Sequence, residues 1–153
     1  MGYTHYWKMD KPMKGLMPLQ KELVLEVLKE NKKFLFGPMG TGKPIFTDDM
    51  ISLNGNAKTD EDHETFEVNF RQSSEFEFCK TARKPYDLAV CKLLCVFSLS
   101  EGFNFSSDGT ERDSKEQRFL GDESWPEALA WFTAKGYSGT IKNKIIPYLN
   151  RKE

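Results

Sequence analysis

Residues 86–99 have the sequence YDLAVCKLLCVFSL, and this stretch decides the fold. At helical spacing its apolar side chains point in every direction, and Lys92 is the only charged residue after Asp87. A helix that is apolar all round is buried in the interior of a domain. Pro85 suits the first turn of such a helix, and Gly102 suits its end. We therefore expect a buried central helix that the rest of the chain covers.

Alternating apolar and polar residues predict several β-strands around this helix. Residues 2–9 place His5 and Trp7 on one face of a strand. Residues 64–70 and 75–80 alternate in the same way and follow one another closely, so we expect them to form a β-hairpin. Shorter strands are expected at residues 34–36, 45–46, 50–53 and 103–105.

Two amphipathic helices are predicted at residues 18–31 and 126–135, where apolar side chains recur at helical spacing. A third is expected at residues 140–149, ended or kinked by Pro147. A chain of 153 residues has the length of one domain. The sequence therefore predicts a single α+β domain over residues 1–153, with a mostly antiparallel sheet packed on the buried central helix.

Composition limits the classes of partner. There are 22 Lys and Arg residues against 23 Asp and Glu, so the net charge is −1, which argues against a nucleic-acid polymer as ligand. The chain has neither an apolar run of about 18 residues nor an apolar signal-peptide core at its start. Three cysteines cannot pair completely, which favours a reducing cytoplasm. We expect a cytoplasmic protein without a membrane partner, and the sequence leaves a homo-oligomer open.

Residues 37–44, GPMGTGKP, nearly match the phosphate-binding loop of nucleotide hydrolases. That loop needs a Ser or Thr hydroxyl where this chain has Pro44, and it must open into a helix whose N–H groups receive the phosphate. Here a short extended segment follows. We therefore interpret these residues as a glycine-rich surface turn between two strands.

Residues 79–87, CKTARKPYD, are the strongest candidate for binding an anion. The first turn of a helix presents unpaired N–H groups and a partial positive charge. Lys80, Arg83 and Lys84 add three cations just before it. The alternative is that Asp87 caps the helix itself while the cations are solvated or pair with nearby acids.

Other polar groups carry weaker signals. His5 and His63 have no second histidine at metal-ligand spacing, and Cys91 and Cys95 share an apolar helix face, so no metal and no cofactor are expected. Residues 106–109, SSDG, are typical of a turn whose hydroxyls can bind a ribose or a phosphate. A nucleophilic triad that uses the serine and aspartate of this turn is disfavoured, because no nucleophile elbow is present.

The chain resembles a family of small proteins of bacteriophages and prophages. The resemblance is carried by GYTHYW (residues 2–7), HETF (63–66), FCKTARKPYDLAV (78–90) and SSDG (106–109), islands that together span roughly residues 2–135. It implies a phage origin and no particular activity. Small cytosolic phage proteins include sponges that sequester nucleotide immune signals.

Two positions depart from that family. A glycine often precedes the HETF island where this chain has Asp62, and position 43 is often acidic where this chain has Lys43. Both departures weaken the phosphate-loop interpretation further.

From these features we expect an anti-defence sponge: a non-enzymatic protein of the infected bacterial cytoplasm that binds a small anionic ADP-ribose-type or cyclic nucleotide. Lysine, arginine and helix N–H groups would hold phosphates, aromatic rings would stack on a base, and the serine turn would bind ribose. The alternatives are a phosphodiesterase or glycohydrolase that uses His63 or His5 as general acid or base with Glu64 or Asp108, or a protein inhibitor of a host defence factor. The expected binding residues are His5, Trp7, His63, Thr65, Lys80, Thr81, Arg83, Tyr86, Asp87, Ser106, Ser107 and Asp108.

Overall fold

A computed structural model describes residues 3–109, 112–113, 118–119 and 124–137. Helices make up about a third of the chain and the sheets are antiparallel, so the α+β class predicted from the sequence is confirmed. The elements are β1 (Thr4–Met9), α1 (Pro18–Glu30), β2 (Ile45–Phe46), β3 (Met50–Leu53), β4 (Phe66–Asn69), β5 (Ser74–Lys80), α2 (Asp87–Phe97), β6 (Phe103–Ser107), β7 (Arg112–Asp113), β8 (Arg118–Phe119) and α3 (Ser124–Ala134).

The strands form two three-stranded sheets and a short two-stranded ribbon. One sheet has the order β5-β1-β6, the other has the order β2-β3-β4, and β7 pairs with β8. The predicted antiparallel strands are thus divided between two sheets. The hairpin prediction was wrong, because β4 pairs with β3 while β5 pairs with β1. The two segments still meet at one end, where the Glu64 N–H donates to the Lys80 carbonyl.

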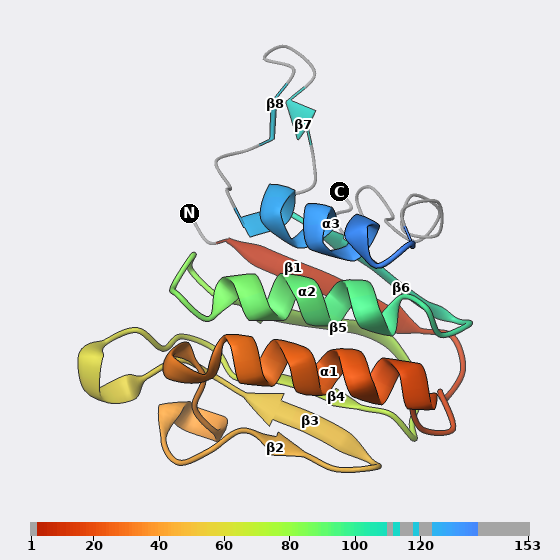
Figure 1. The fold of residues 1–153 in the computed structure, drawn as a ribbon, viewed down its shortest axis with the longest axis horizontal. Helices are drawn as coiled ribbons and strands as arrows, with labels where there is room; N and C mark the ends of the chain where they lie inside the picture. Colours follow the sequence, from red (N-terminus) through yellow and green to blue (C-terminus); the bar gives the residue numbers. More distant parts are fainter. Residues whose placement is uncertain (1–2, 110–111, 114–117, 120–123, 138–153) are drawn as a thin grey trace.

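The predicted central helix is confirmed as α2. Every residue from Ala89 to Phe97 is buried, and α1 and α3 lie on either side of α2 in one layer in front of the strands (Figure 1). Lys92 is 6% exposed, with Nζ 3.8 Å from a carboxylate oxygen of Glu30 on α1. The same ammonium group lies 5.2 Å from the ring centroid of Trp131 on α3. One cation thus contacts both neighbours of the helix.

Strand β1 has an inner face toward the helices and an outer face away from them. His5 and Trp7 are buried on the inner face. Tyr6 pairs with Phe78 on β5 and with Ser106 on β6, and directly paired residues of antiparallel strands share a face. These three residues therefore lie together on the outer face of the β5-β1-β6 sheet.

Several local predictions need correction. Residues 34–36 do not form a strand, because Lys32–Phe34 is a 3-10 turn and Phe36 makes only an isolated bridge to Asn54. Ser106 and Ser107 belong to β6 and not to a turn. The expected helix at residues 140–149 lies outside the described residues.

The glycine-rich segment 37–44 is a turn, as predicted, and it uses its own backbone donors. The Gly37 N–H donates to the carbonyls of Thr41 and Gly42, and the Gly40 N–H donates to the Gly37 carbonyl. A Cβ at position 37 would lie 2.5 Å from the Lys43 carbonyl oxygen, so the turn is closed tightly on itself. Those N–H groups do not form an open cradle for a phosphate.

No helix in the described part of the chain is both long and apolar enough to cross a membrane.

Candidate functional site

The segment that enters α2 is a tight, hydrogen-bonded turn. Thr81 N–H donates to the Tyr3 carbonyl, Lys84 N–H donates to the Thr81 carbonyl, and Asp87 N–H donates to the Lys84 carbonyl. Ala82 and Arg83 have φ values of 54° and 56°. Each non-glycine residue in this left-handed region costs about 1 kcal/mol or more, so the rest of the turn must hold the two residues there.

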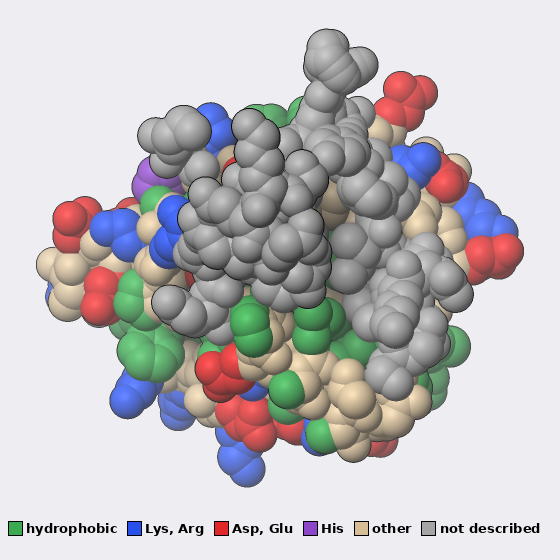
Figure 2. All heavy atoms as spheres, turned by 90° about the horizontal axis from the view of Figure 1, so that it is seen from above, with side chains coloured by type: hydrophobic (Ala, Val, Ile, Leu, Met, Phe, Trp, Pro, Cys, Tyr) green, Lys and Arg blue, Asp and Glu red, His purple; other side chains and the backbone are tan. Residues whose placement is uncertain are grey.

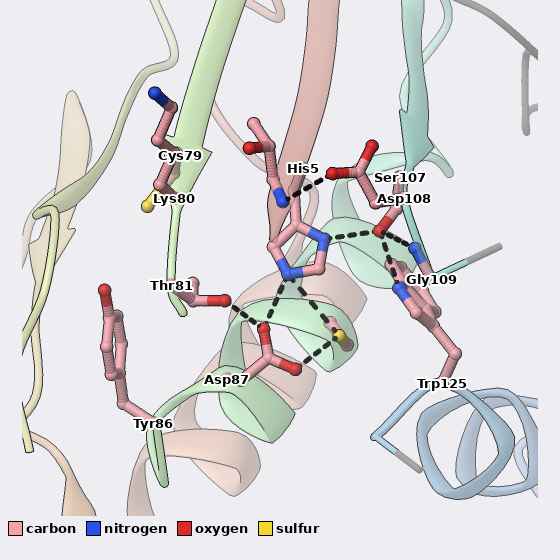
Figure 3. Close-up of polar contacts among 12 residues, drawn as sticks. His5, Cys79, Lys80, Thr81, Tyr86, Asp87, Ser107, Asp108, Gly109 and Trp125 are labelled. Atoms are coloured by element: carbon pink, nitrogen blue, oxygen red, sulfur yellow. Dashed lines mark hydrogen bonds and ion pairs between the residues drawn. The ribbon is translucent and has the colours of Figure 1, made fainter. Parts of the chain in front are cut away.

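The carboxylate of Asp87 does not cap the helix that it begins. One oxygen, Oδ1, lies 2.6 Å from Nε2 of His5 and accepts a short hydrogen bond from the Thr81 hydroxyl. The other, Oδ2, accepts from the Cys91 thiol at 3.7 Å. Figure 3 shows the carboxylate turned toward β1 and the start of the turn. The alternative that Asp87 satisfies the first N–H groups of α2 is therefore wrong.

On its other side the His5 ring contacts Ser107, with Nδ1 2.8 Å from Oγ. The same Oγ accepts from the indole N–H of Trp125 at 2.9 Å and from the Gly109 N–H at 3.0 Å. The His5 ring thus lies between Ser107 and Asp87, with one ring nitrogen within hydrogen-bond distance of each (Figure 3).

Burial by itself would raise the pKa of the Asp87 carboxyl group, because it disfavours the charged form. Attraction to the adjacent His5, its hydrogen bond, and hydrogen bonds from the Thr81 and Ser124 hydroxyls outweigh burial and hold this pKa below its ordinary value. Asp87 is also the first residue of α2, where the helix dipole favours a negative charge. The buried carboxylate is thus ionised.

Ser107, His5 and Asp87 have the order of donors and acceptors of a catalytic triad, with Asp87 in the role that the sequence offered to Asp108. His5 and Ser107 are both 0% exposed. Because Ser107 Oγ already accepts two hydrogen bonds, its lone pairs are engaged and do not face a substrate. As the structure has it, this network stabilises the fold and does not present a nucleophile.

His5, Asp87 and Cys91 also place three potential metal ligands within 4.8 Å of one another. A metal on Nε2 would move the ring proton to Nδ1, and Ser107 Oγ would then face three donors, more than it can accept. Burial, followed by the charges of Asp87 and Cys95, raises the pKa of the Cys91 thiol, whereas a metal ligand must be a thiolate. The arrangement does not fit a resident metal ion.

The three cations before α2 point to different partners. Lys84 Nζ donates to the Asp60 carbonyl at 2.8 Å, and the Arg83 guanidinium lies 4.3 Å from the ring centroid of Tyr3. Lys80 is exposed, and its side chain points away from His5 (Figure 3). The expected convergence of the three side chains on one anion is not present in the structure.

The remaining predicted site residues divide between the interior and the surface. Trp7 packs against Phe66, and Tyr86 is buried with its hydroxyl 2.6 Å from the Glu64 carbonyl, so neither ring is available to stack on a base. His63 is exposed, with Nδ1 2.7 Å from the Lys80 carbonyl. The Thr65 hydroxyl accepts from the Met39 N–H and from the Asn54 side chain.

Three aromatic residues that the sequence analysis missed lie on the outer face of the β5-β1-β6 sheet. Phe76 and Phe78 are 41% and 47% exposed, and their ring centroids are 5.5 Å apart with the planes inclined by 26°. Tyr6 lies 6.2 Å from Phe76 at 21°. The alternation of β5, in which both phenylalanines share a face with Lys80, is the sequence signal that was available.

Polar groups border these rings. Lys80 pairs with Thr4 in the row next to Phe78 and Tyr6. Asp108 accepts hydrogen bonds from the Thr4 N–H at 3.0 Å and from the Tyr6 hydroxyl at 3.2 Å. Ser106 Oγ is buried and forms no hydrogen bond with any described residue. We call Tyr6, Phe76, Phe78, Lys80, Ser106 and Asp108 the outer-face cluster.

Comparisons with known proteins add no relative: no family model, curated protein or solved structure matches this chain.

Proposed function

We propose that the protein binds a small anionic nucleotide without turning it over, and that the ligand lies on the outer-face cluster. The observation that carries the proposal is the group of exposed, nearly parallel rings beside an exposed lysine on one sheet face. Stacking of a base on an aromatic side chain contributes about 1–3 kcal/mol, and it needs an accessible ring. Phe76 and Phe78 meet that requirement, whereas Trp7 and Tyr86 do not.

The polar members of the cluster fit the rest of a nucleotide. Lys80 would hold a phosphate. The Asp108 carboxylate would accept hydrogen bonds from ribose hydroxyls.

The positions of two of the acid and base candidates, His5 and Asp108, support binding without turnover. His5 is fully buried and engaged on both ring nitrogens, and Asp108 already accepts two hydrogen bonds. Figure 2 looks onto an edge of the molecule and not onto the outer sheet face, and around its margin Lys/Arg and Asp/Glu side chains are intermixed without one dominant sign. With the net charge of −1, this favours a small ligand over a nucleic-acid polymer.

With the resemblance to small phage proteins, this chemistry supports a sponge for a nucleotide immune signal in the cytoplasm of an infected bacterium. ADP-ribose conjugates and cyclic nucleotides both combine a base, a ribose and phosphates. The outer-face cluster offers a contact for each of these parts.

The test is calorimetric titration of the full chain with ADP-ribose, cyclic ADP-ribose and a cyclic dinucleotide. We expect at least one to bind, and the variants Phe78→Ala and Lys80→Ala each to lose that binding while remaining folded. Leu25→Ala, which removes a side chain of similar exposure from α1, is the matched control and should bind like the wild type.

Mass spectrometry after heat release separates binding from catalysis. Ligand recovered intact supports a sponge, and hydrolysis products would show that the protein is an enzyme. If none of the three nucleotides binds, or if Phe78→Ala and Leu25→Ala bind equally, the proposal fails.

A further inference from the structure

A groove of about 620 Å³ lies between the end of α1 and the glycine-rich turn, far along the sequence from the outer-face cluster. Its volume is within the range of pockets that hold small molecules. It is lined by Leu28, Lys32, Lys33, Leu35, Phe36, Gly42, Lys43 and Pro44.

The fold brings three lysines to this groove from two segments. Lys32 and Lys33 form the 3-10 turn that follows α1, and Lys43 ends the glycine-rich turn. Because the Gly37 N–H donates to the carbonyls of Thr41 and Gly42, that turn folds back and returns Lys43 to the groove. The segment that resembled a phosphate-binding loop therefore contributes a cation by a different geometry.

The charge in the groove is uncompensated by its own lining. None of the lining residues is acidic, and none of the three ammonium groups forms an ion pair or hydrogen bond with a residue that the structure describes. Lys33 Nζ lies 5.0 Å from the ring centroid of Phe34, which leaves its charge intact. An anion is the complementary guest.

The rest of the lining restricts the ligand further. Leu28, Leu35, Phe36 and Pro44 present apolar surface, and apart from the lysines no lining side chain can donate or accept a hydrogen bond. A nucleobase or a sugar would leave its polar edges unpaired against such walls, at a cost in affinity. An acyl chain or a hydrocarbon ring has no polar edges, so it would bind against these walls without that cost.

We infer that this groove is a second binding site, independent of the proposed nucleotide site, for a small organic anion with an apolar body. The body lies against Leu28, Leu35, Phe36 and Pro44, and the carboxylate or sulfonate head lies at Lys32, Lys33 and Lys43. Apolar burial supplies affinity, and the lysines select for the charged head.

The test uses 8-anilinonaphthalene-1-sulfonate as a fluorescent probe and decanoate as its competitor. We expect decanoate to displace the probe, and we expect decan-1-ol, which lacks the charge, and acetate, which lacks the body, to fail at the same concentration. In the double variant K32Q/K43Q the affinity for decanoate should fall about tenfold, and K32R/K43R should restore it.

The matched control K14Q/K58Q removes two exposed lysines outside the groove and should bind decanoate like the wild type. Equal displacement by decan-1-ol, equal affinity in K32Q/K43Q and K14Q/K58Q, or no displacement by decanoate would each overturn the inference. Nucleotide titration of K32Q/K43Q tests whether the two sites are independent. Unchanged nucleotide binding is expected, and its loss would overturn their independence.

Discussion

The two faces of strand β1 differ in how their polar groups are used. On the inner face, His5 joins Ser107 and Asp87 in a chain of hydrogen bonds that is closed to solvent. On the outer face, one residue further along the strand, Tyr6 lies among exposed phenylalanine rings. The inner face resembles a catalytic centre in its residue types, yet it is buried, whereas the outer face exposes the rings of Phe76 and Phe78. Residue type alone therefore does not identify a site until each side chain is assigned to a face.

The largest effect should come from removing the carboxylate of the inner network. Asp87→Ala leaves the His5 N–H and the Thr81 hydroxyl without an acceptor in the interior, so we expect the free energy of unfolding to fall by about 3 kcal/mol. Urea denaturation measures this. In the control Asp49→Ala, an exposed ion pair with Arg71 is lost, and the change should stay under about 1 kcal/mol. Similar losses in both variants would contradict a structural role for the network.

Two adjacent serines give a sharper comparison of the faces. Ser107→Ala leaves three buried polar groups without their partner, and we expect a loss of about 2 kcal/mol in the free energy of unfolding. Ser106→Ala removes a hydroxyl that has no described partner, so it should change stability by less than about 0.5 kcal/mol. If thermal and urea unfolding show the reverse order, the assignment of the two faces is wrong.

The pH dependence of stability should carry the signature of Asp87. Its pKa is lower in the folded protein than in the unfolded chain, so its contribution is complete above the unfolded value of about 3.9. That contribution is lost as the pH falls from there through the lower folded pKa, because the unfolded chain takes up the proton first. Urea titrations of the wild type and of Asp87→Asn at pH 7, 5, 4 and 3 measure the difference. The stability gap should narrow below about pH 4, and a constant gap would rule out this linkage.

The smallest effect on stability is expected on the outer face. Phe78 is 47% exposed, so Phe78→Ala should change the free energy of unfolding by less than about 1 kcal/mol. The same variant is expected to lose nucleotide binding. A large loss of stability would mean that the ring is needed for packing, and it would remove the main support for a stacking surface.

The sequence predicted elements with strong local signals better than their pairing. The apolar pattern of α2 and the proline at the start of α1 were sufficient to find those helices. The pairing of β5 with β1 and not with β4 was missed, because it is set by contacts between distant segments: Tyr6 lies opposite Phe78. Local alternation and a short connection favoured a hairpin, and packing on β1 outweighed them.

The site was predicted only in part, for a related reason. His5 and Ser107 are 102 residues apart in the chain, and His5 and Asp87 are 82 apart. Polar residues in apolar surroundings can either bind a ligand or satisfy one another, and a single sequence does not distinguish these outcomes. Phe76 and Phe78 show the same alternation as Phe66 and Val68, yet the first two are exposed and the other two are buried, so alternation alone did not identify the exposed rings.

Lys92 has a consequence for the uniqueness of the native state. A helix that is apolar all round, such as α2, could be rotated about its own axis with little change in the apolar area that it buries. A single ammonium group that contacts Glu30 on one side and Trp131 on the other favours the observed rotational setting of α2 over the others. That setting also directs Asp87, five residues earlier, at His5, so one charge in the middle of the helix aligns the chemistry at its end.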